Sequence, residues 1–240
     1  MNILIDLFDH SGHAAEPYRK NGWHIIQVDI KHGIDILEWN YKSAILKVVN
    51  EKWQYSTMPK IGLLAAIPCT DYANCGALWF ARKDMDGSTA KSQLLVDKTY
   101  EIIQNIKQYY SLSFWRIENP MSRIHKLNPW MGPVKFKFNP CDFSGYNYIS
   151  IGEWARLDLL KGKKMSEVEK IELQLVMDKN LYNKETWLWG DFNAPEKRYL
   201  TPIWKEFPGH ILYGGKSERT KELRSVDPKG FCQAFYEANN

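Results

Sequence analysis

Residues 61–69 read Ile61-Gly62-Leu63-Leu64-Ala65-Ala66-Ile67-Pro68-Cys69, and this stretch decides the fold. Its apolar run has the length of a buried β-strand, and the proline ends it. We therefore expect a strand over residues 60–67 that delivers Cys69 into the loop at its carboxyl end. In open α/β sheets, ligands bind at that edge. A thiol in this place is either a nucleophile or an inert, small loop residue.

Strand-like and helix-like segments alternate on both sides of this stretch. The expected strands cover 2–8, 23–29, 60–67 and 113–118, and the expected helices cover 14–21, 41–53 and 89–110. Such alternation predicts an α/β fold with a doubly wound, mostly parallel sheet. The loops after Ile67 and Ile117 then lie at the same carboxyl edge of the sheet.

The second half of the chain is less regular. Residues 130–148 are rich in Pro, Gly and aromatic side chains, which is typical of loops. We expect a charged surface helix over 161–174, a strand and turn over 182–192, and a closing amphipathic helix over 228–239.

Length and composition limit the classes of protein that fit. The chain has 240 residues and is 44% hydrophobic, which is enough for one large α/β domain. Its net charge of +4 is compatible with a phosphate-bearing partner but does not demand one. The four cysteines lack a paired spacing, and His10 and His13 have no third ligand nearby, so no metal site is expected. Without a leader or a long apolar run, a cytoplasmic protein with no membrane partner is expected.

Four features at the strand ends carry chemistry. The first strand runs into a turn that contains Gly12, as in folds that hold nucleotide cofactors. Asp29 ends the second strand, where an acid either accepts hydrogen bonds from ribose hydroxyls or caps a helix. The third feature is Pro68-Cys69, and the fourth is Glu118-Asn119-Pro120. A carboxyl group beside a thiol is what nucleophilic attack on a pyrimidine ring requires.

In this order the motifs resemble those of the DNA (cytosine-5) methyltransferases, most closely the short, phage-type members of that family. The resemblance rests on Asp6-Leu7-Phe8-x-x-Ser11-Gly12, Asp29, Gly33-Ile34-Asp35-Ile36, Pro68-Cys69-Thr70-Asp71-Tyr72-Ala73 and Ile117-Glu118-Asn119-Pro120. It covers residues 3–130 well and the remainder in patches, such as Thr186-Trp187-Leu188-Trp189-Gly190.

The resemblance implies a Rossmann-like fold that uses S-adenosyl-L-methionine, or a carboxylated relative of it. It implies that Cys69 is the nucleophile and Glu118 the acid that engages the ring. The residues implied for cofactor binding are Phe8, Asp9, Ser11, Gly12, Asp29, Ile30, Asp35, Ile36 and Pro68. It divides the chain into a catalytic and cofactor-binding core (1–135), a reduced target-recognition or insert region (136–185) and a segment that completes the core (186–240).

The sequence departs from the family pattern in several places. Asp29 stands where the family has Glu, Thr70 follows the cysteine in place of Gln, and Gly12 is the only glycine of its turn. The family's Gln-x-Arg-x-Arg motif, which helps to hold the target base, is missing. The arginines that could replace it are Arg116, Arg123, Arg219 and Arg224, and Arg123 is the first choice because it follows Glu118 closely.

The expected function is transfer of a methyl or related one-carbon-derived group to C5 of cytosine in DNA. The DNA would be single-stranded or would present a flipped base, and a protein partner could supply targeting. A phage-encoded protein would act in the cytoplasm of the host cell. Two alternatives stay open: modification of a pyrimidine nucleotide or RNA base, and a non-catalytic nucleic-acid-binding protein that keeps the fold.

Overall fold

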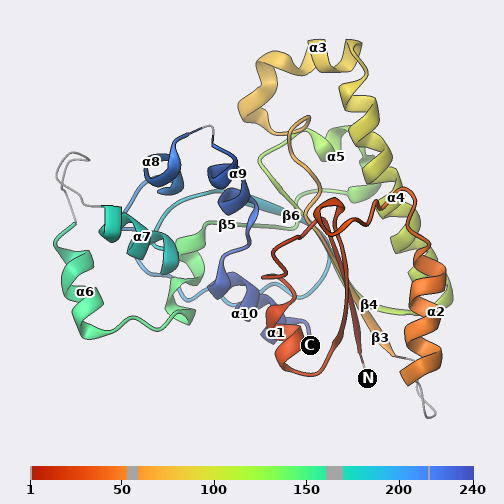
Figure 1. Cartoon of the computed structure of the whole chain (residues 1–240), viewed down its shortest axis with the longest axis horizontal. Helices are drawn as coiled ribbons and strands as arrows, with labels where there is room; N and C mark the ends of the chain where they lie inside the picture. The colour runs from red at the N-terminus through yellow and green to blue at the C-terminus, as the bar shows by residue number, and fades with distance from the viewer. Residues whose placement is uncertain (1, 53–58, 161–169, 216) are drawn as a thin grey trace. The chain divides into compact units, whose positions relative to one another are not determined.

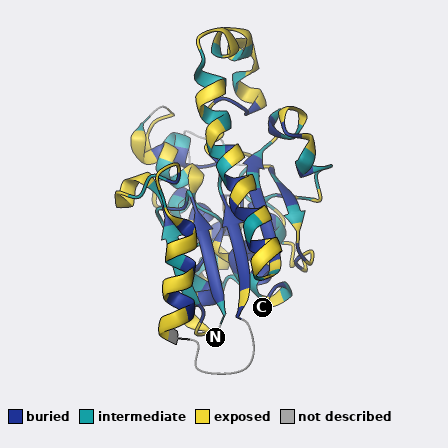
Figure 2. Cartoon of the chain, turned by 90° about the vertical axis from the view of Figure 1, so that its right-hand side faces the viewer, coloured by how far each residue is buried: buried dark blue, intermediate teal, exposed yellow. Residues whose placement is uncertain are grey.

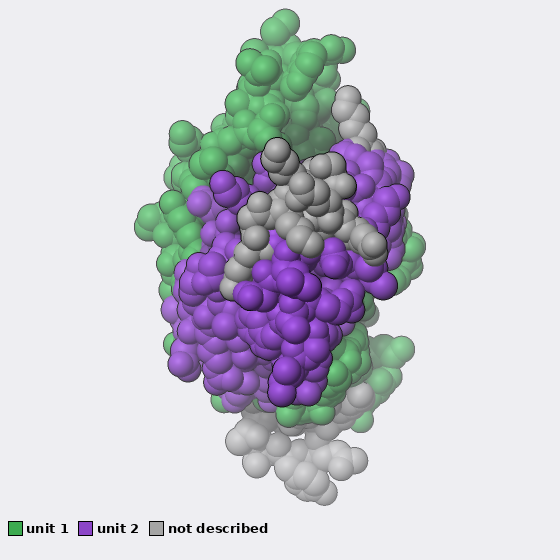
Figure 3. All heavy atoms as spheres, turned by 90° about the vertical axis from the view of Figure 1, so that its left-hand side faces the viewer, with its two compact units in different colours: residues 1–137, 186–193, 239 green, residues 138–185, 194–238, 240 purple. Residues whose placement is uncertain are grey.

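The computed structural model describes residues 2–52, 59–160, 170–215 and 217–240. The chain forms two compact units, coloured separately in Figure 3. Unit 1 comprises residues 1–137, 186–193 and 239, and unit 2 comprises residues 138–185, 194–238 and 240.

Unit 1 is built on a mostly parallel sheet. The strands are β1 (Ile3–Leu7), β2 (His24–Val28), β3 (Lys60–Ala65), β4 (Ser111–Pro120), β5 (Phe136–Phe138) and β6 (Thr186–Asp191), in the order β2-β1-β3-β4-β6-β5. The pairs among β1 to β4 are parallel, whereas β6 runs antiparallel to β4. The expected α/β class and the four alternating strands are confirmed.

The helices of unit 1 are α1 (Glu16–Lys20), η1 (Ile30–His32), α2 (Tyr41–Lys52), η2 (Asn74–Trp79), α3 (Phe80–Met85), α4 (Ser88–Tyr109), α5 (Ile124–Leu127) and η3 (Pro129–Met131). Of these, α1, α2 and α4 flank the sheet, whereas α3 projects beyond its end (Figure 1). Tyr18 of α1 stacks on Phe114 of β4, with ring centroids 5.7 Å apart. On the opposite face, side chains of α2 and α4 pack on Ile5, Leu63 and Ile117. Figure 2 shows the resulting buried strands between exposed helix surfaces.

Two glycines allow close packing inside the sheet. A Cβ on Gly62 of β3 would lie 2.2 Å from the Phe114 ring, and one on Gly190 of β6 would lie 2.1 Å from the Trp115 carbonyl oxygen. Both distances are far below a van der Waals contact. The absence of a side chain at these glycines therefore allows β3 and β6 to approach β4 closely. β4 is the strand that carries Glu118.

Unit 2 is mainly helical, with η4 (Pro140–Tyr146), α6 (Ile151–Asp158), α7 (Lys170–Asp178), α8 (Gly209–Tyr213), α9 (Glu218–Ser225) and α10 (Lys229–Ala238). Phe138 stacks on Phe231 of α10 at 4.1 Å, and Phe143 contacts the same ring edge-on. A second cluster contains Leu157, Val176, Leu181 and Phe207.

The observed division differs from the expected one after residue 193. Residues 186–193 belong to unit 1, but 194–238 group with unit 2, because α10 packs its aromatic face on η4. Of the surface helix expected over 161–174, residues 161–169 lie outside the described part of the chain, and α7 occupies 170–178.

Candidate active site

Cys69 lies in an exposed turn beyond the carboxyl end of β3. Ile67 is buried, whereas Pro68, Cys69 and Thr70 are exposed. The carbonyl oxygen of Cys69 accepts hydrogen bonds from the amides of Tyr72 (3.0 Å) and Ala73 (2.8 Å), which fold the chain back at once. The turn therefore holds a cysteine at the sheet edge where an external molecule can reach it.

Glu118 lies on the neighbouring strand β4, one residue beyond the last registered pair of β3 and β4. Because Ala65 of β3 is in register with Ile117 of β4, Ile67 comes level with Asn119. The Asn119 side chain is fully buried, and its Nδ2 donates a hydrogen bond to the Ile67 carbonyl oxygen at 2.8 Å. This bond ties the residue after Glu118 to the residue two before Cys69.

The two chain segments stay together beyond this bond. Ala73 forms an antiparallel bridge with Ser122, and the Asn74 amide donates to the Met121 carbonyl oxygen at 2.9 Å. The Arg123 amide donates to the Tyr72 carbonyl oxygen at 2.9 Å. The segment after Cys69 and the segment after Glu118 thus form a short paired ribbon, which sets the position of each relative to the other.

The expected cofactor turn lies at the same edge. Phe8 (φ 64°) and Gly12 (φ 66°) both adopt left-handed backbone conformations. Asp9 closes the turn, because its carboxylate accepts hydrogen bonds from the amides of Ser11 (2.8 Å), Gly12 (3.0 Å) and Ala14 (3.3 Å). Asp9 therefore shapes this turn from within, and its expected contact with a cofactor stays a prediction.

The turn is positioned by the neighbouring strands. The Phe8 amide donates to the Val28 carbonyl oxygen at 2.8 Å, and the Ala66 amide donates to the Leu7 carbonyl oxygen at 3.0 Å. The segment after β1 thus begins between those that follow β2 and β3.

Asp29 and Asp35 each cap a short turn after β2. Asp29 accepts a hydrogen bond from the Lys31 amide at 2.8 Å, and Asp35 accepts one from the Leu37 amide at 2.9 Å. Each of these bonds uses one carboxylate oxygen. The adjacent apolar residues differ in exposure, since Ile30 is exposed and Ile36 is buried. Their predicted roles toward ribose and adenine are untested.

Arg123 is held by several partners of its own. Its guanidinium binds both carboxylate oxygens of Asp84 (2.9 and 2.7 Å) and the Thr89 hydroxyl (3.0 Å), and its Nε donates to the Asp71 carbonyl oxygen (3.2 Å). These contacts anchor the arginine beside the Cys69 turn. Its expected role in holding a target base remains a prediction.

Sequence reasoning missed the contributions of Asn119, Asp71 and Lys83. Asp71 is buried, binds Lys83 at 2.9 Å and accepts a hydrogen bond from the Ser92 hydroxyl. Burial raises the pKa of Asp71, but the bonds from Ser92 and Lys83 outweigh it, so the net pKa is lowered. For Asp71, the visible signal was an acid two residues after a candidate nucleophile, but its partners Lys83 and Ser92 lie further along the chain.

Comparison of the chain with protein-family models, curated proteins and solved structures finds no match. Within the described residues, no three or more His, Cys, Asp or Glu side chains gather as metal ligands would. No helix in the described ranges has the length and apolar character required to span a bilayer.

Proposed function

We propose that the protein transfers a methyl or related one-carbon-derived group from S-adenosyl-L-methionine to C5 of cytosine in DNA. The observation that carries the proposal is the hydrogen bond from Asn119 to Ile67, which draws the ends of β3 and β4 together. It supports a role for Cys69 and Glu118 in one reaction, because their backbone positions are fixed together at an accessible sheet edge.

The proposed reaction begins with attack of the Cys69 thiolate on C6 of the ring, which forms the S–C6 bond. The Glu118 carboxyl group engages N3 and the exocyclic amino group, so that the electron pair displaced from the C5–C6 double bond makes C5 nucleophilic. C5 then takes the methyl group, and the donor leaves as its neutral thioether. A base removes the C5 proton, the double bond forms again and the thiolate departs.

The donor would supply an electrophilic methyl group, and the carboxyl edge of β1 and β2 offers the residues to hold it. Phe8, Ser11 and Gly12 would line it, Asp29 with Ile30 would contact its ribose, and Asp35 with Ile36 its adenine. The Gly12 turn fits this use, because a Cβ there would meet the Gln27 side chain at 3.2 Å and narrow the turn. Pro68 would complete the site beside the nucleophile.

The proposal is tested by incubating the protein with methyl-labelled S-adenosyl-L-methionine and single- or double-stranded DNA, with RNA and free cytidine nucleotides in parallel. We expect label at C5 of cytosine in DNA. Cys69→Ala should abolish transfer, whereas Cys75→Ala, which changes another exposed cysteine, in the adjacent helix η2, should retain it. Absence of transfer to every substrate would refute the proposed function. Label confined to RNA or nucleotide would support the alternative substrate instead.

A further inference from the structure

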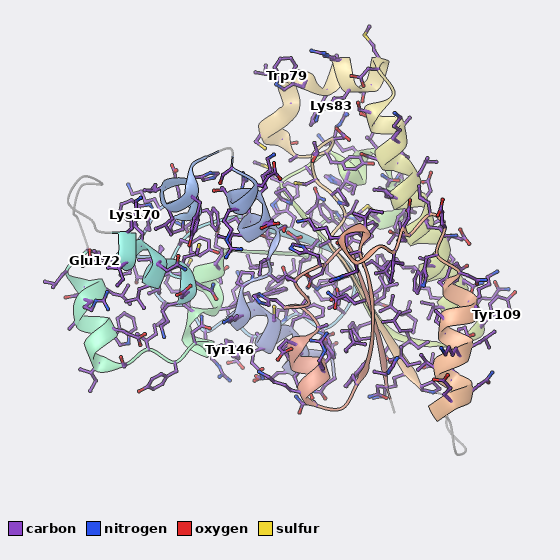
Figure 4. The ribbon with its side chains drawn as sticks, viewed as in Figure 1. Trp79, Lys83, Tyr109, Tyr146, Lys170 and Glu172 are labelled. Carbon is purple, nitrogen blue, oxygen red and sulfur yellow. The ribbon has the colours of Figure 1, made fainter. Side chains whose placement is uncertain are left out.

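The segment η2–α3, residues 74–85, follows the Cys69 turn and lacks a core of its own. Neither η2 nor α3 has a buried residue. Leu78, Trp79 and Met85 are largely exposed, and Figure 4 labels Trp79 and Lys83 on this segment. Hydrophobic packing therefore contributes little to its position, which must depend on polar contacts.

Arg123 supplies the most extensive of these contacts. It binds Asp84 of α3 with both ends of the guanidinium fork, and its Cζ lies 3.8 Å from the centroid of the Phe80 ring. Thr89 at the start of α4 joins the pair, because its hydroxyl donates to Asp84 at 2.6 Å and accepts from Arg123 at 3.0 Å. One side chain thus connects the chain after β4 with α3 and α4.

The same arginine also contacts the Cys69 turn. Its Nε donates to the Asp71 carbonyl oxygen at 3.2 Å, and its backbone amide donates to Tyr72. Lys83 of α3 approaches the turn as well, with its ammonium group 2.9 Å from the Asp71 carboxylate and 2.5 Å from the Thr70 carbonyl oxygen. Two cationic side chains from separate elements, Arg123 and Lys83, therefore hold the turn.

These bonds leave the guanidinium little capacity for a substrate. A guanidinium has five N–H donors, and the contacts with Asp84, Thr89 and Asp71 occupy four of them. The side chain is also mostly buried, at 13% exposure. An arginine arranged in this way is suited to fix protein geometry, since its rigid fork holds each partner in one orientation.

We propose that Arg123, through Asp84, is a positioning residue that clamps the Cys69 turn to the η2–α3 segment. It acts on the nucleophile through the backbone of Asp71 and Tyr72. The expected effect of the clamp on methyl transfer rests on the proposed function. The clamp itself does not, because hydrogen exchange measures it directly.

The test uses Asp84→Asn, Arg123→Lys and the double variant. Asp84 is 48% exposed, so Asp84→Asn should fold even if Arg123→Lys does not. The matched control is Asp86→Asn, because Asp86 lies just beyond the same segment and accepts its hydrogen bonds from the amide and hydroxyl of Ser88. Hydrogen exchange should accelerate by about tenfold at the amides of Tyr72 and Ala73 in both clamp variants, since local opening controls exchange there. The control should exchange as the wild type does. Unchanged exchange in Asp84→Asn would overturn the clamp.

Transfer kinetics separate positioning from direct base contact. If Arg123 acts through Asp84, both single variants should lower kcat with little change in KM for DNA, and the double variant should lose no more than the more impaired single variant. Full activity in Asp84→Asn together with a loss in Arg123→Lys would overturn the proposal in favour of base contact. If no variant or wild type transfers a methyl group, the proposed function fails, while the exchange result still decides the clamp.

Discussion

Substitution of Asn119 by alanine removes the bond that holds the ends of β3 and β4 together. Asn119 is fully buried and donates to the carbonyl oxygen of Ile67, a residue that is itself 3% exposed. The alanine variant leaves that oxygen without its donor in an interior where water does not replace it easily.

The size of the effect follows from this burial. An orphaned, buried hydrogen-bonding group costs about 1–3 kcal/mol. Part of that cost is offset, because the Asn119 Oδ1 is buried without a hydrogen-bond partner among the described residues and is removed with the side chain. We therefore expect a loss of about 2 kcal/mol, equivalent to a fall in Tm of about 4–8 °C for a chain of this size.

The assay combines thermal unfolding with hydrogen exchange at the Cys69 turn. The matched control is Asn128→Ala, because Asn128 is also buried and donates to a backbone carbonyl, that of Ile124, at 2.9 Å. Both variants should lose stability, but only Asn119→Ala should also speed exchange at Tyr72 and Ala73. Equal exchange in the two variants would refute the reasoning that Asn119 positions the nucleophile loop.

Three further predictions concern packing, pH and chemistry. Gly62→Ala should destabilise the protein by about 1–3 kcal/mol in denaturant titration, because the new Cβ would lie 2.2 Å from the Phe114 ring; an unchanged midpoint would contradict the packing. The hydrogen bond from Arg123, followed by that from Thr89, lowers the pKa of Asp84 from 3.8 to about 2. The stabilising contribution of Asp84 is therefore complete above its unfolded pKa and is lost as the pH falls through about 2. Protection of the Cys69 turn from hydrogen exchange should accordingly be constant from pH 7 to 5. Loss of protection within that range would contradict the role of Asp84 in holding the turn. Glu118→Gln should lower the transfer rate by about 100-fold or more with little change in Tm, because Glu118 is only half-buried; a rate near that of the wild type would exclude its acid role.

The sequence allowed the first four strands to be predicted closely. The apolar run over 60–67 corresponds to β3 (Lys60–Ala65), and the expected strand at 113–118 lies inside β4 (Ser111–Pro120). Both runs are short, buried and bounded by turn residues, so their local pattern is sufficient to identify them. The antiparallel direction of β6 was not predicted, because a strand's own sequence does not specify its partner.

Contacts between segments that are distant in the sequence could not be predicted from local sequence patterns. Phe231 stacks on Phe138, more than ninety residues earlier in the chain, and this stacking places residues 194–238 in unit 2. Likewise, the order of the motifs suggested that Cys69 and Glu118 meet, but nothing in the sequence indicated that Asn119 would bond to Ile67.

Arg123 shows what sequence proximity leaves out. Its position five residues after Glu118 made it the first choice for holding a target base. In the structure its guanidinium faces Asp84, which is 39 residues earlier, and the Phe80 ring. Identifying that partner required the fold, because α3 carries both residues and contacts the chain after β4.

The most direct test of the central claim is capture of the covalent adduct on Cys69. In an oligonucleotide that contains 5-fluorocytosine, C5 carries no proton for a base to remove after methyl transfer, so the thiolate cannot leave. Incubation with S-adenosyl-L-methionine should give a stable complex whose intact mass equals protein plus methylated oligonucleotide, with the modification on the Cys69 peptide. Cys69→Ala should give none, and Cys75→Ala should give the full amount. A wild-type protein that transfers methyl groups to cytosine C5 but forms no adduct, or forms it on another residue, would contradict the assignment of Cys69 as the nucleophile.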